Sequence, residues 1–291
     1  MTVLITGAGG QLGRALLEGV PQGVAVEHLT RAALDIGDES AVEGQIQKLH
    51  PAVIINAAGF TQVDAAQSAP EQALRANAQG PRLLAAACAR AGARLLHVST
   101  DYVFDGEQTR PYQPTDAPSP LSLYGMSKRE GETHVTRILG ENACIVRTSW
   151  LYSGSGRNSV TRMHERLQSG TRLRVVSDQI GAPTAAFGLA EVLWRLALAP
   201  RGGIFHWSDA GVASWYDLAL AIAEEAHTLG LVPADYQVDP IDSREYPTAA
   251  KRPRYSLLDR RATEAALCLS AAHWRVNLRK TLRIIAGHRA P

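Results

Sequence analysis

The chain has little of several features that mark specialised protein classes. Its 291 residues include only three cysteines, Cys88, Cys144 and Cys268, and their spacing fits neither a disulfide framework nor a zinc site. Positive and negative side chains nearly balance at a net charge of +2, which does not favour nucleic acid or a membrane surface as a partner. No apolar run reaches the length of a membrane span, and the first residues show no signal peptide. We therefore expect a cytoplasmic protein that binds neither nucleic acid nor membranes.

The pattern of apolar residues is typical of an α/β protein. Short, β-branched apolar runs lie at 3–6, 24–29, 53–56, 94–99, 144–147, 173–176 and 204–206. Between them lie helical patterns at 11–19, 39–49, 70–91, 124–139, 158–168 and 185–199. Strands that are apolar throughout and alternate with helices predict a parallel sheet covered on both faces, which is the doubly wound, Rossmann-like fold.

The alternation of predicted strands and helices becomes less regular after about residue 205. Further helices are predicted at 214–229 and 273–286, on either side of a proline-rich connection. We expect residues 1–150 to form a dinucleotide-binding domain, to which part of 170–205 returns, and residues 151–291 to form mainly a smaller substrate-binding region. Near the end, the basic stretch "KRPRYSLLDRR" is either a solvated loop or a site for an acidic ligand.

A glycine-rich turn follows the first predicted strand in "VLITGAGGQLGRALLEGV". The three-residue spacing of Gly7, Gly10 and Gly13 permits a tight turn, close approach to a pyrophosphate and close packing of helix on strand. The start of the following helix, at Gln11 and Leu12, supplies free N–H groups and a partial positive charge. The alternative is an ordinary strand–helix turn that binds no ligand. Because this turn follows the first strand of the chain and leads directly into a helix, a dinucleotide site is favoured.

The end of the second predicted strand bears on which dinucleotide binds. An acidic residue there would hold the ribose hydroxyls of NAD, but the sequence has Leu29, Thr30 and Arg31. Arg31 can face the 2′-phosphate of NADPH, or it is an ordinary surface arginine. NADPH is favoured, and use of NADH stays open. Other residues expected around the cofactor are Asp35 and Ile36 near the adenine, and Ala57, Ala58, Gly59, Thr61 and Val98 on the pocket floor.

Tyr124 and Lys128 in "SPLSLYGMSK" are four residues apart and share one face of a predicted helix. A free tyrosine has a pKa of about 10, and a nearby ammonium or a helix N-terminus would lower it. The pair can therefore act as a tuned general acid, although a surface tyrosine and lysine on a helix are common and are the better interpretation of the pair taken alone.

A second signal comes at the end of the fourth predicted strand, in "HVSTDYVFDG". Ser99, Thr100 and Asp101 lie where active sites of such sheets gather, and a hydroxyl there can hydrogen-bond a substrate carbonyl. These residue types also favour plain turns. The order of glycine loop, strand-end hydroxyl and tyrosine–lysine pair makes coincidence a poor explanation.

The blocks "TGAGGQLG", "NAAGFTQVD", "STDYVFDG", "SPLSLYGMSK", "RTSWLY", "SDQIGAPT" and "RPRYSLL" resemble the extended short-chain dehydrogenase/reductases. Within them, the chain is most similar to the dTDP-4-dehydrorhamnose reductase family, over nearly its whole length. The resemblance implies an NAD(P)H-dependent reduction of the C4 keto group of dTDP-4-dehydro-L-rhamnose to dTDP-L-rhamnose, in the biosynthesis of cell-surface polysaccharide. It implies that Tyr124 donates the proton, that Lys128 holds the nicotinamide ribose and lowers the pKa of Tyr124, and that Thr100 binds the C4 oxygen.

The resemblance also implies a set of residues around the sugar nucleotide. Trp150 in "RTSWLY" would stack near the sugar, although a core tryptophan at a strand end is about as well supported by the residues alone. Arg252 would face the nucleotide diphosphate. The substrate-binding residues implied in this way are Thr61, Val63, Thr100, Asp101, Tyr102, Trp150 and Arg252.

Two departures from the family pattern concern a bridging metal. Some members carry glutamates two residues past the third glycine and just after "GAPT", which help to bind a divalent ion between subunits. Gln67 replaces a glutamate elsewhere in the family pattern, whereas the two metal-binding positions are taken here by Ala15 and Phe187. We therefore expect no metal site, and a monomer or a weak homodimer without a bridging ion.

Two other functions stay open. Relatives of this family include NADP-binding regulatory subunits of a methionine adenosyltransferase, but such a protein need not keep Thr100, Tyr124 and Lys128 together. A nucleotide-sugar epimerase retains its cofactor and usually favours NAD, which the absent acid after the second strand opposes.

Overall fold

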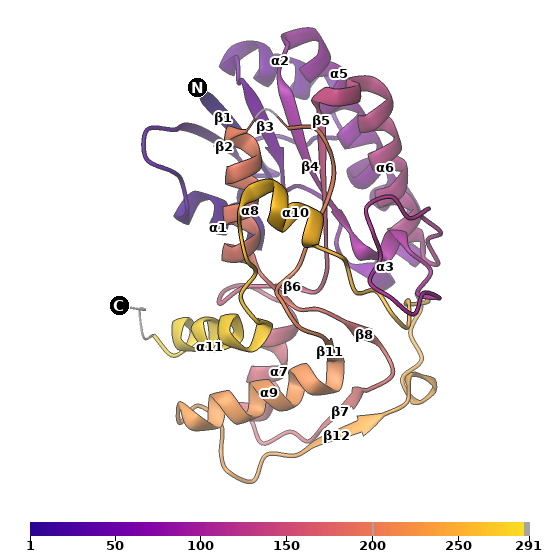
Figure 1. The fold of residues 1–291 in the computed structure, drawn as a ribbon, viewed down its shortest axis with the longest axis vertical. Coiled ribbons are helices and arrows are strands. Elements are labelled where there is room, and N and C mark those ends of the chain that lie inside the picture. Colours follow the sequence, from indigo (N-terminus) through magenta and orange to yellow (C-terminus); the bar gives the residue numbers. More distant parts are fainter. Residues whose placement is uncertain (200, 288–291) are drawn as a thin grey trace.

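The computed structural model describes residues 1–199 and 201–287, and its centre is a sheet of six parallel strands (Figure 1). The strands lie in the order β10–β5–β4–β3–β1–β2. Their bounds are β1 (Thr2–Thr6), β2 (Ala25–Leu29), β3 (Val53–Asn56), β4 (Arg94–Thr100), β5 (Ala143–Thr148) and β10 (Gly203–Trp207). The predicted doubly wound α/β fold is confirmed.

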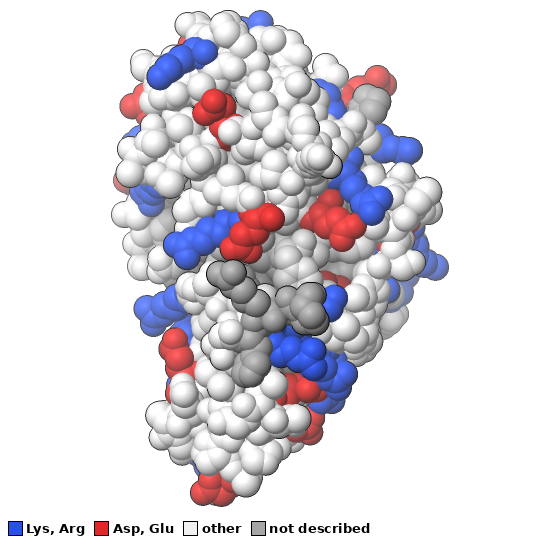
Figure 2. Space-filling view, turned by 90° about the vertical axis from the view of Figure 1, so that its left-hand side faces the viewer, with Lys and Arg blue, Asp and Glu red and all other residues white. Residues whose placement is uncertain are grey.

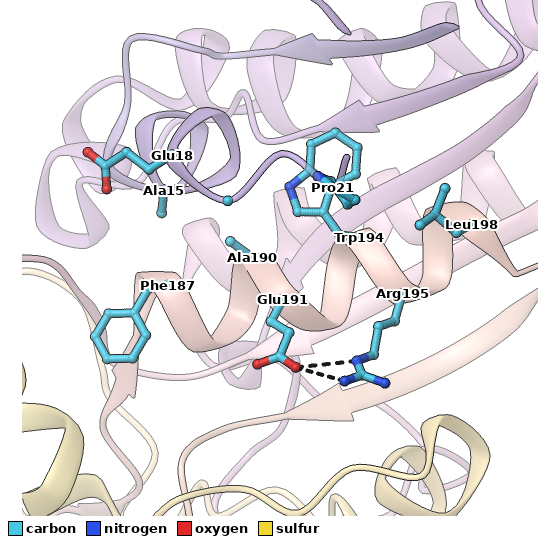
Figure 3. Close-up of a pocket in the computed structure, with 10 residues that line it drawn as sticks. Ala15, Glu18, Pro21, Phe187, Ala190, Glu191, Trp194, Arg195 and Leu198 are labelled. Atoms are coloured by element: carbon cyan, nitrogen blue, oxygen red, sulfur yellow. Dashed lines mark hydrogen bonds and ion pairs between the residues drawn. The ribbon is translucent and has the colours of Figure 1, made fainter. Parts of the chain in front are cut away.

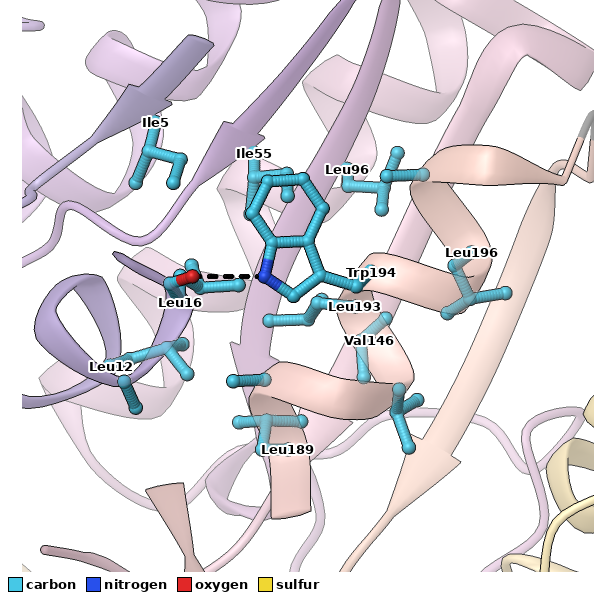
Figure 4. Packing of buried hydrophobic residues seen from close by; sticks show 14 of the residues in the cluster. Ile5, Leu12, Leu16, Ile55, Leu96, Val146, Leu189, Leu193, Trp194 and Leu196 are labelled. Atoms are coloured by element: carbon cyan, nitrogen blue, oxygen red, sulfur yellow. Dashed lines mark hydrogen bonds between the residues drawn. The ribbon is translucent and has the colours of Figure 1, made fainter. Parts of the chain in front are cut away.

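Helices cover both faces of the central strands, and successive side chains of a strand point to opposite faces. Val3 and Ile5 belong to one apolar cluster, with α1 (Gln11–Glu18) and α8 (Ala186–Leu198). Leu4, between them, belongs to the other cluster, with α2 (Glu39–Leu49), α5 (Gly80–Ala91) and α6 (Leu123–Leu139). Figure 4 shows the first cluster, in which the Trp194 indole N–H donates to the Leu16 carbonyl at 2.9 Å. The continuous apolar runs of the sequence thus reflect two separate cores.

The order of strands places a topological switch point between β1 and β3. The chain leaves β1 for β2 on one side and then returns to form β3 on the other side. Parallel sheets of this kind bind ligands beyond the carboxyl ends of the strands, at the point where the connections diverge. The glycine loop after Thr6 and the segment after Asn56 meet at that point.

The helical pattern at 70–91 was predicted as one helix, and this prediction was wrong in detail. The segment forms α4 (Pro70–Leu74), a π-helical turn η1 (Arg75–Gln79) and α5, and a further short helix α3 (Val63–Ser68) precedes it. A π-helical turn inserts an extra residue into the helical repeat and is frequent at functional sites. Apolar periodicity does not reveal such a turn.

The other predicted strands and helices lie outside the main sheet. In the lower part of Figure 1, α7 (Ser159–Gln168), α9 (Trp215–Thr228) and α11 (Trp274–Ile285) lie beside three two-stranded sheets. These sheets pair β7 (Leu173–Val176) with β12 (Val238–Ile241), β8 (Ile180–Gly181) with β11 (Ala213–Ser214), and β6 (Leu151–Tyr152) with β9 (Thr184–Ala185). The strand predicted at 173–176 exists but does not join the main sheet.

Three short 3₁₀ turns and one more helix complete the described chain. The turns are η2 (Asp101–Val103), η3 (Gly140–Asn142) and η4 (Ser243–Glu245). Helix α10 (Arg261–Leu267) packs on β10 and α8, so the chain returns late to the main sheet. Within residues 1–199 and 201–287, no helix is both long and apolar enough to cross a membrane. On the face in Figure 2, basic and acidic side chains are intermixed.

Candidate active site

The glycine loop is held by close backbone contacts that exclude larger residues. Gly7 has φ of +70°, and a Cβ added there would lie 2.5 Å from the Ala58 nitrogen. A Cβ at Gly13 would lie 2.4 Å from the Gly7 carbonyl oxygen. These two glycines therefore let β1, α1 and the segment after β3 meet.

The first turn of α1 leaves backbone donors without helical partners. Gly10 takes the N-cap position with no side-chain cap, and the Arg14 amide is the first to bond back, to the Gly10 carbonyl at 3.0 Å. The amides of Gln11, Leu12 and Gly13 consequently have no partner within the helix. An uncapped helix N-terminus beside glycines that keep the backbone accessible fits the pyrophosphate of a dinucleotide.

The end of β2 lies beside this loop. The Ala8 amide donates to the Leu29 carbonyl at 3.1 Å, and Arg31 follows as an exposed side chain. The Asp35 carboxylate accepts from the Gly37 amide and from Arg75, both at 2.9 Å. Ile36 is buried in the core, so its side chain has a packing role. Contact of Arg31, Asp35 or Ile36 with an adenosine half stays a prediction.

The pocket floor joins the segment after β3 to the end of β4. Lys128 donates from Nζ to the Val98 carbonyl at 2.6 Å. A Cβ added at Gly59 would lie 3.5 Å from the same Nζ. The structure thus brings Gly59, Val98 and Lys128 together, next to Ala57 and Ala58 at the glycine loop.

Helix α6 begins where the prolines predicted a loop. Ser122 is its N-cap and accepts from the Gly125 amide at 3.2 Å, which places Tyr124 in the first turn. Tyr124 is 9% exposed and Lys128 is 5% exposed. The Tyr124 ring packs edge-on against Tyr102 at a centroid distance of 5.8 Å, with Val63 in the same cluster. Thr61, two residues before Val63, is exposed.

The structure reverses the direction expected for the pKa of Tyr124. Burial raises that pKa to about 12, against a hydrogen bond with Thr100 that lowers it. Burial lowers the pKa of Lys128 to about 8, against the charge of Glu132, which raises it. The prediction that Lys128 lowers this pKa was wrong, because burial of the phenol raises it and the opposing contribution comes from Thr100. Tyr124 is therefore protonated at neutral pH, which is the form that can give a proton.

The residues after β4 are linked in a short chain of hydrogen bonds. Thr100 donates from Oγ1 to Asp101 Oδ1 at 3.0 Å and accepts from the Tyr102 amide at 3.2 Å. Burial raises the pKa of Asp101 to about 7. Burial also raises the pKa of Tyr102, and the nearby charge of Arg252 opposes that rise. The predicted Thr100, Asp101, Tyr102 and Arg252 thus form one group beside Tyr124.

Arg252 comes from a distant part of the chain and is fixed by an ion pair. Its Nη1 and Nη2 donate to Asp64 Oδ1 and Oδ2 at 3.1 and 2.6 Å. The Ala250 amide also donates to Asp64 Oδ1, at 3.1 Å. A cavity of about 540 Å³ opens beside Arg252 and is lined also by Lys251, Arg254 and Tyr246. Its lining also includes Asp105 and Glu107, so three basic side chains face two acidic ones there.

Trp150 has an unusual backbone and a well-packed ring. Its φ is +45°, which is strained for a residue other than glycine. The ring stacks on Trp215 at a centroid distance of 3.8 Å, and a Cβ added at Gly181 would lie 2.9 Å from it. Trp150 is only partly buried, so it retains some exposed area for a ligand.

Asn77 is a buried residue that the sequence motifs did not point to. It lies in η1, where its side chain donates to the Phe60 carbonyl at 2.9 Å and to Ser127 Oγ at 3.1 Å. Its Oδ1 accepts from the Phe60 amide at 2.8 Å, and Ser127 donates in turn to the Tyr124 carbonyl at 2.8 Å. Asn77 thus ties the pocket floor to α6. A lone asparagine within a helical pattern carries no spacing signal.

Ala15 and Phe187, the positions of the missing glutamates, line one shared groove between α1 and α8 (Figure 3). This groove of about 500 Å³ is lined by mostly apolar residues and contains none of the predicted catalytic residues. Its Glu191 side chain is paired with Arg195 at 3.0 Å. The described residues form no group of three or more side chains that could hold a metal ion. The absence of a metal stays a prediction.

Comparisons with known proteins agree with this geometry. The family model for the RmlD substrate binding domain matches residues 1–286. A dTDP-4-dehydrorhamnose reductase of Mycobacterium tuberculosis is 42% identical, over 96% of this chain and 92% of its own length. The chain belongs to the dTDP-4-dehydrorhamnose reductase family.

Solved structures extend the similarity. A dTDP-4-dehydrorhamnose reductase from Clostridium acetobutylicum has a TM-score of 0.92 and 36% identity, over 98% of this chain and all of its own. One from Bacillus anthracis, solved in complex with NADP, has a TM-score of 0.90 and 34% identity, over 96% and 98% of the two chains. The family resemblance of the sequence blocks is confirmed.

Proposed function

We propose that this chain reduces the C4 keto group of dTDP-4-dehydro-L-rhamnose with NADPH, giving dTDP-L-rhamnose. The observation that carries the proposal is the buried group of Thr100, Tyr124 and Lys128 beside an uncapped, glycine-lined helix start. The similarity to dTDP-4-dehydrorhamnose reductases over nearly the whole chain supports the same reaction.

The cofactor would lie along the carboxyl ends of β1, β3 and β4. Free amides at Gln11, Leu12 and Gly13 suit its pyrophosphate, and the exposed Arg31 suits a 2′-phosphate. The NADP complex of the Bacillus anthracis relative supports NADPH, and use of NADH stays open. When bound, NADPH supplies the hydride for C4.

The protein's own residues supply the proton and hold the oxygen. Tyr124 gives its phenolic proton to the oxygen that becomes the C4 hydroxyl, and Thr100 hydrogen-bonds the same oxygen. Lys128, as an ammonium 2.6 Å from the Val98 carbonyl, stabilises the phenolate that remains and can hold the nicotinamide ribose. A proton from solvent then restores Tyr124.

The sugar nucleotide would lie between the two regions of the molecule. Asp101, Tyr102 and Val63 surround Tyr124, and Trp150 and Thr61 offer exposed area for the sugar. Arg252, fixed by Asp64, lies at the cavity lined also by Lys251 and Arg254, and its guanidinium suits the diphosphate.

Absorbance of the reduced cofactor tests the proposal. Purified protein with NADPH and dTDP-4-dehydro-L-rhamnose should consume NADPH in proportion to added sugar nucleotide, and a parallel reaction with NADH ranks the cofactors. Sugar isomerisation without net NADPH loss would instead indicate an epimerase. Tight NADPH binding without turnover would indicate a regulatory subunit.

Two further properties belong to the proposal. The three cysteines are free thiols, which is consistent with a reducing, cytoplasmic location. Without acidic residues at positions 15 and 187, any homodimer would form without a bridging metal and would be weak.

A further inference from the structure

The face of α6 that carries the proposed catalytic pair extends by one more turn to a buried acid. Tyr124, Lys128 and Glu132 follow one another at intervals of four residues, so their side chains lie along one face of the helix. Glu132 has no exposed side-chain area. The mechanism proposed above assigns it no role.

Glu132 is held by a two-pronged ion pair with the sheet. Arg147 in β5 donates from Nε to Glu132 Oε1 at 2.9 Å and from Nη2 to Oε2 at 2.8 Å. Arg129, one turn back on α6, adds a bond to Oε2 at 3.2 Å. This geometry fixes both the position of the carboxylate and the rotation of α6 relative to β5.

Arg147 is itself enclosed by its neighbours. It pairs in register with Ser99 of β4 on one side and with His206 of β10 on the other. Its guanidinium lies over the Phe104 ring, 5.1 Å from the centroid, and its Nη1 donates to His206 Nε2 at 3.3 Å. Because arginine cannot accept, His206 carries its proton on Nδ1, which donates to the Tyr112 carbonyl at 2.9 Å.

The ionisable groups near Lys128 differ in the charge that they carry at neutral pH. His97 of β4 is neutral, because burial, together with the charge of Lys128, lowers its pKa well below the usual range. Tyr124 on α6 is protonated at neutral pH. The charge of Asp101 in η2 raises the pKa of Tyr124, whereas the pKa of Lys128 is raised by the charge of Glu132. Arg129 and Arg147 are cations that face Glu132. Glu132 is thus the anion whose charge favours an ammonium at Lys128.

We propose that Glu132, fixed by Arg147, is a positioning residue that keeps Lys128 charged and holds the Tyr124–Lys128 face of α6 against β5. The inference rests on the proposed roles of Tyr124 and Lys128 for its bearing on catalysis. Its electrostatic part concerns the protein alone and can be measured without cofactor or substrate.

The test is a titration of Lys128 by nuclear magnetic resonance. The sequence has four lysines, Lys48, Lys128, Lys251 and Lys280, so carbon-13 labelled lysine gives a simple spectrum, and Lys128→Met identifies the signal. In the unaltered chain we expect a midpoint near the pKa of about 8. In Glu132→Gln the midpoint should fall by roughly one pH unit. An unchanged midpoint would overturn the proposal.

A double variant separates charge from folding. Glu132→Gln leaves Arg147 buried without its partner and can unfold the chain, whereas Glu132→Met with Arg147→Met removes both charges and retains apolar packing. We expect the double variant to fold and its Lys128 midpoint to fall by less than in the single variant, because loss of the Arg147 cation partly offsets loss of the Glu132 anion. A midpoint like that of the unaltered chain would mean that the ion pair has only a structural role.

Glu130→Gln is the matched control, since Glu130 lies on the same helix, is 53% exposed and pairs with His134. It should leave the Lys128 midpoint in place, and an equal shift there would contradict a specific role for Glu132. In the reductase assay, the alkaline fall of kcat/KM should move with the Lys128 midpoint. A shift in the titration without reductase activity would contradict the proposed function while leaving the electrostatic inference intact.

Discussion

The proposed active site has a cofactor side, at the glycine loop, and a substrate side, at Arg252, and the two are built in different ways. On the cofactor side, backbone atoms meet at the strand ends, as in the bond from the Gly10 amide to the Gly7 carbonyl. On the substrate side, side chains meet from far apart, as in Arg252 and Asp64, which are 188 residues apart. Backbone geometry therefore determines the first side, and pairing of individual side chains determines the second. Changes on the two sides should have different consequences.

The largest effect should come where the two sides meet, at Tyr124. Tyr124→Phe removes the proton donor and little volume, so kcat should fall by roughly 10²–10⁴-fold. The Kd for NADPH should change little, because the cofactor side stays intact. Turnover by rapid mixing and NADPH binding by fluorescence check both values. Tyr216→Phe, a partly buried tyrosine of α9, is the control, and near-normal turnover of Tyr124→Phe would remove it as the acid.

Gly13→Ala tests the backbone side of the comparison. The added Cβ would lie 2.4 Å from the Gly7 carbonyl, so the loop must move, at a cost of roughly 1–3 kcal/mol in the free energy of unfolding. NADPH binding should weaken more than tenfold. Gly44→Ala in α2 is the matched control, because a Cβ there meets nothing within 4 Å. It should stabilise the chain by about 0.5–1 kcal/mol in urea unfolding. Equal effects of the two changes would contradict this account of the loop.

Arg252→Gln tests the side-chain pairing of the substrate side. Loss of a charged contact to a diphosphate should raise KM for the sugar nucleotide by roughly 10–100-fold, with a smaller change in kcat and none in NADPH affinity. Arg244→Gln is the control, since Arg244 is 84% exposed and pairs with Asp242. Steady-state kinetics decide the point. A change in NADPH affinity instead would place Arg252 on the cofactor side.

Lys128→Met should separate function from stability. The pKa of Lys128 is lowered to about 8 in the fold, so the unfolded chain binds more protons between pH 8 and its ordinary value. Burial of the ammonium therefore lowers the free energy of unfolding by its full amount below about pH 8. This loss disappears as the pH rises above 8. At neutral pH the variant should be more stable by roughly 1–3 kcal/mol while losing activity. Urea unfolding at neutral and alkaline pH measures this gain in stability. A variant that is less stable than the unaltered chain at both pH values would contradict the prediction.

The smallest effect should be at Arg31. Arg31→Ala should reduce the preference for NADPH over NADH by roughly two- to fivefold, about 0.5–1 kcal/mol, because an exposed charge pair contributes little. The ratio of kcat/KM for the two cofactors measures this preference. Arg14→Ala, an exposed arginine of α1, should leave the ratio unchanged. If it is also unchanged for Arg31→Ala, another residue selects the cofactor.

The sequence predicted most of the cofactor side, because repeating apolar runs and glycine spacing are local signals. They located β1, the loop at Gly7 and the strand end at Thr100 within a residue or two. Chain order alone also brought Tyr124 and Lys128 to that edge. The family resemblance was needed to relate Trp150 and Arg252 to the same cleft.

Other features could not be predicted because they depend on tertiary contact. The π-helical turn at Asn77, the two-residue strands of the lower region and the Glu132–Arg147 pair have no local signature. The pKa of Tyr124 was predicted in the wrong direction, since burial is a property of the folded molecule. Local sequence patterns thus predict the main strands and helices, whereas the pKa values of the site residues depend on tertiary packing.

Transfer of a labelled hydride tests the central claim most directly. NADPH deuterated on the transferred position of its nicotinamide would be mixed with purified protein and dTDP-4-dehydro-L-rhamnose, and the product examined by nuclear magnetic resonance and mass spectrometry. We predict one deuterium at C4 of the sugar per NADPH consumed, and none with Tyr124→Phe on the same timescale. Product without deuterium at C4, or NADPH consumption that does not depend on the sugar nucleotide, would contradict the account.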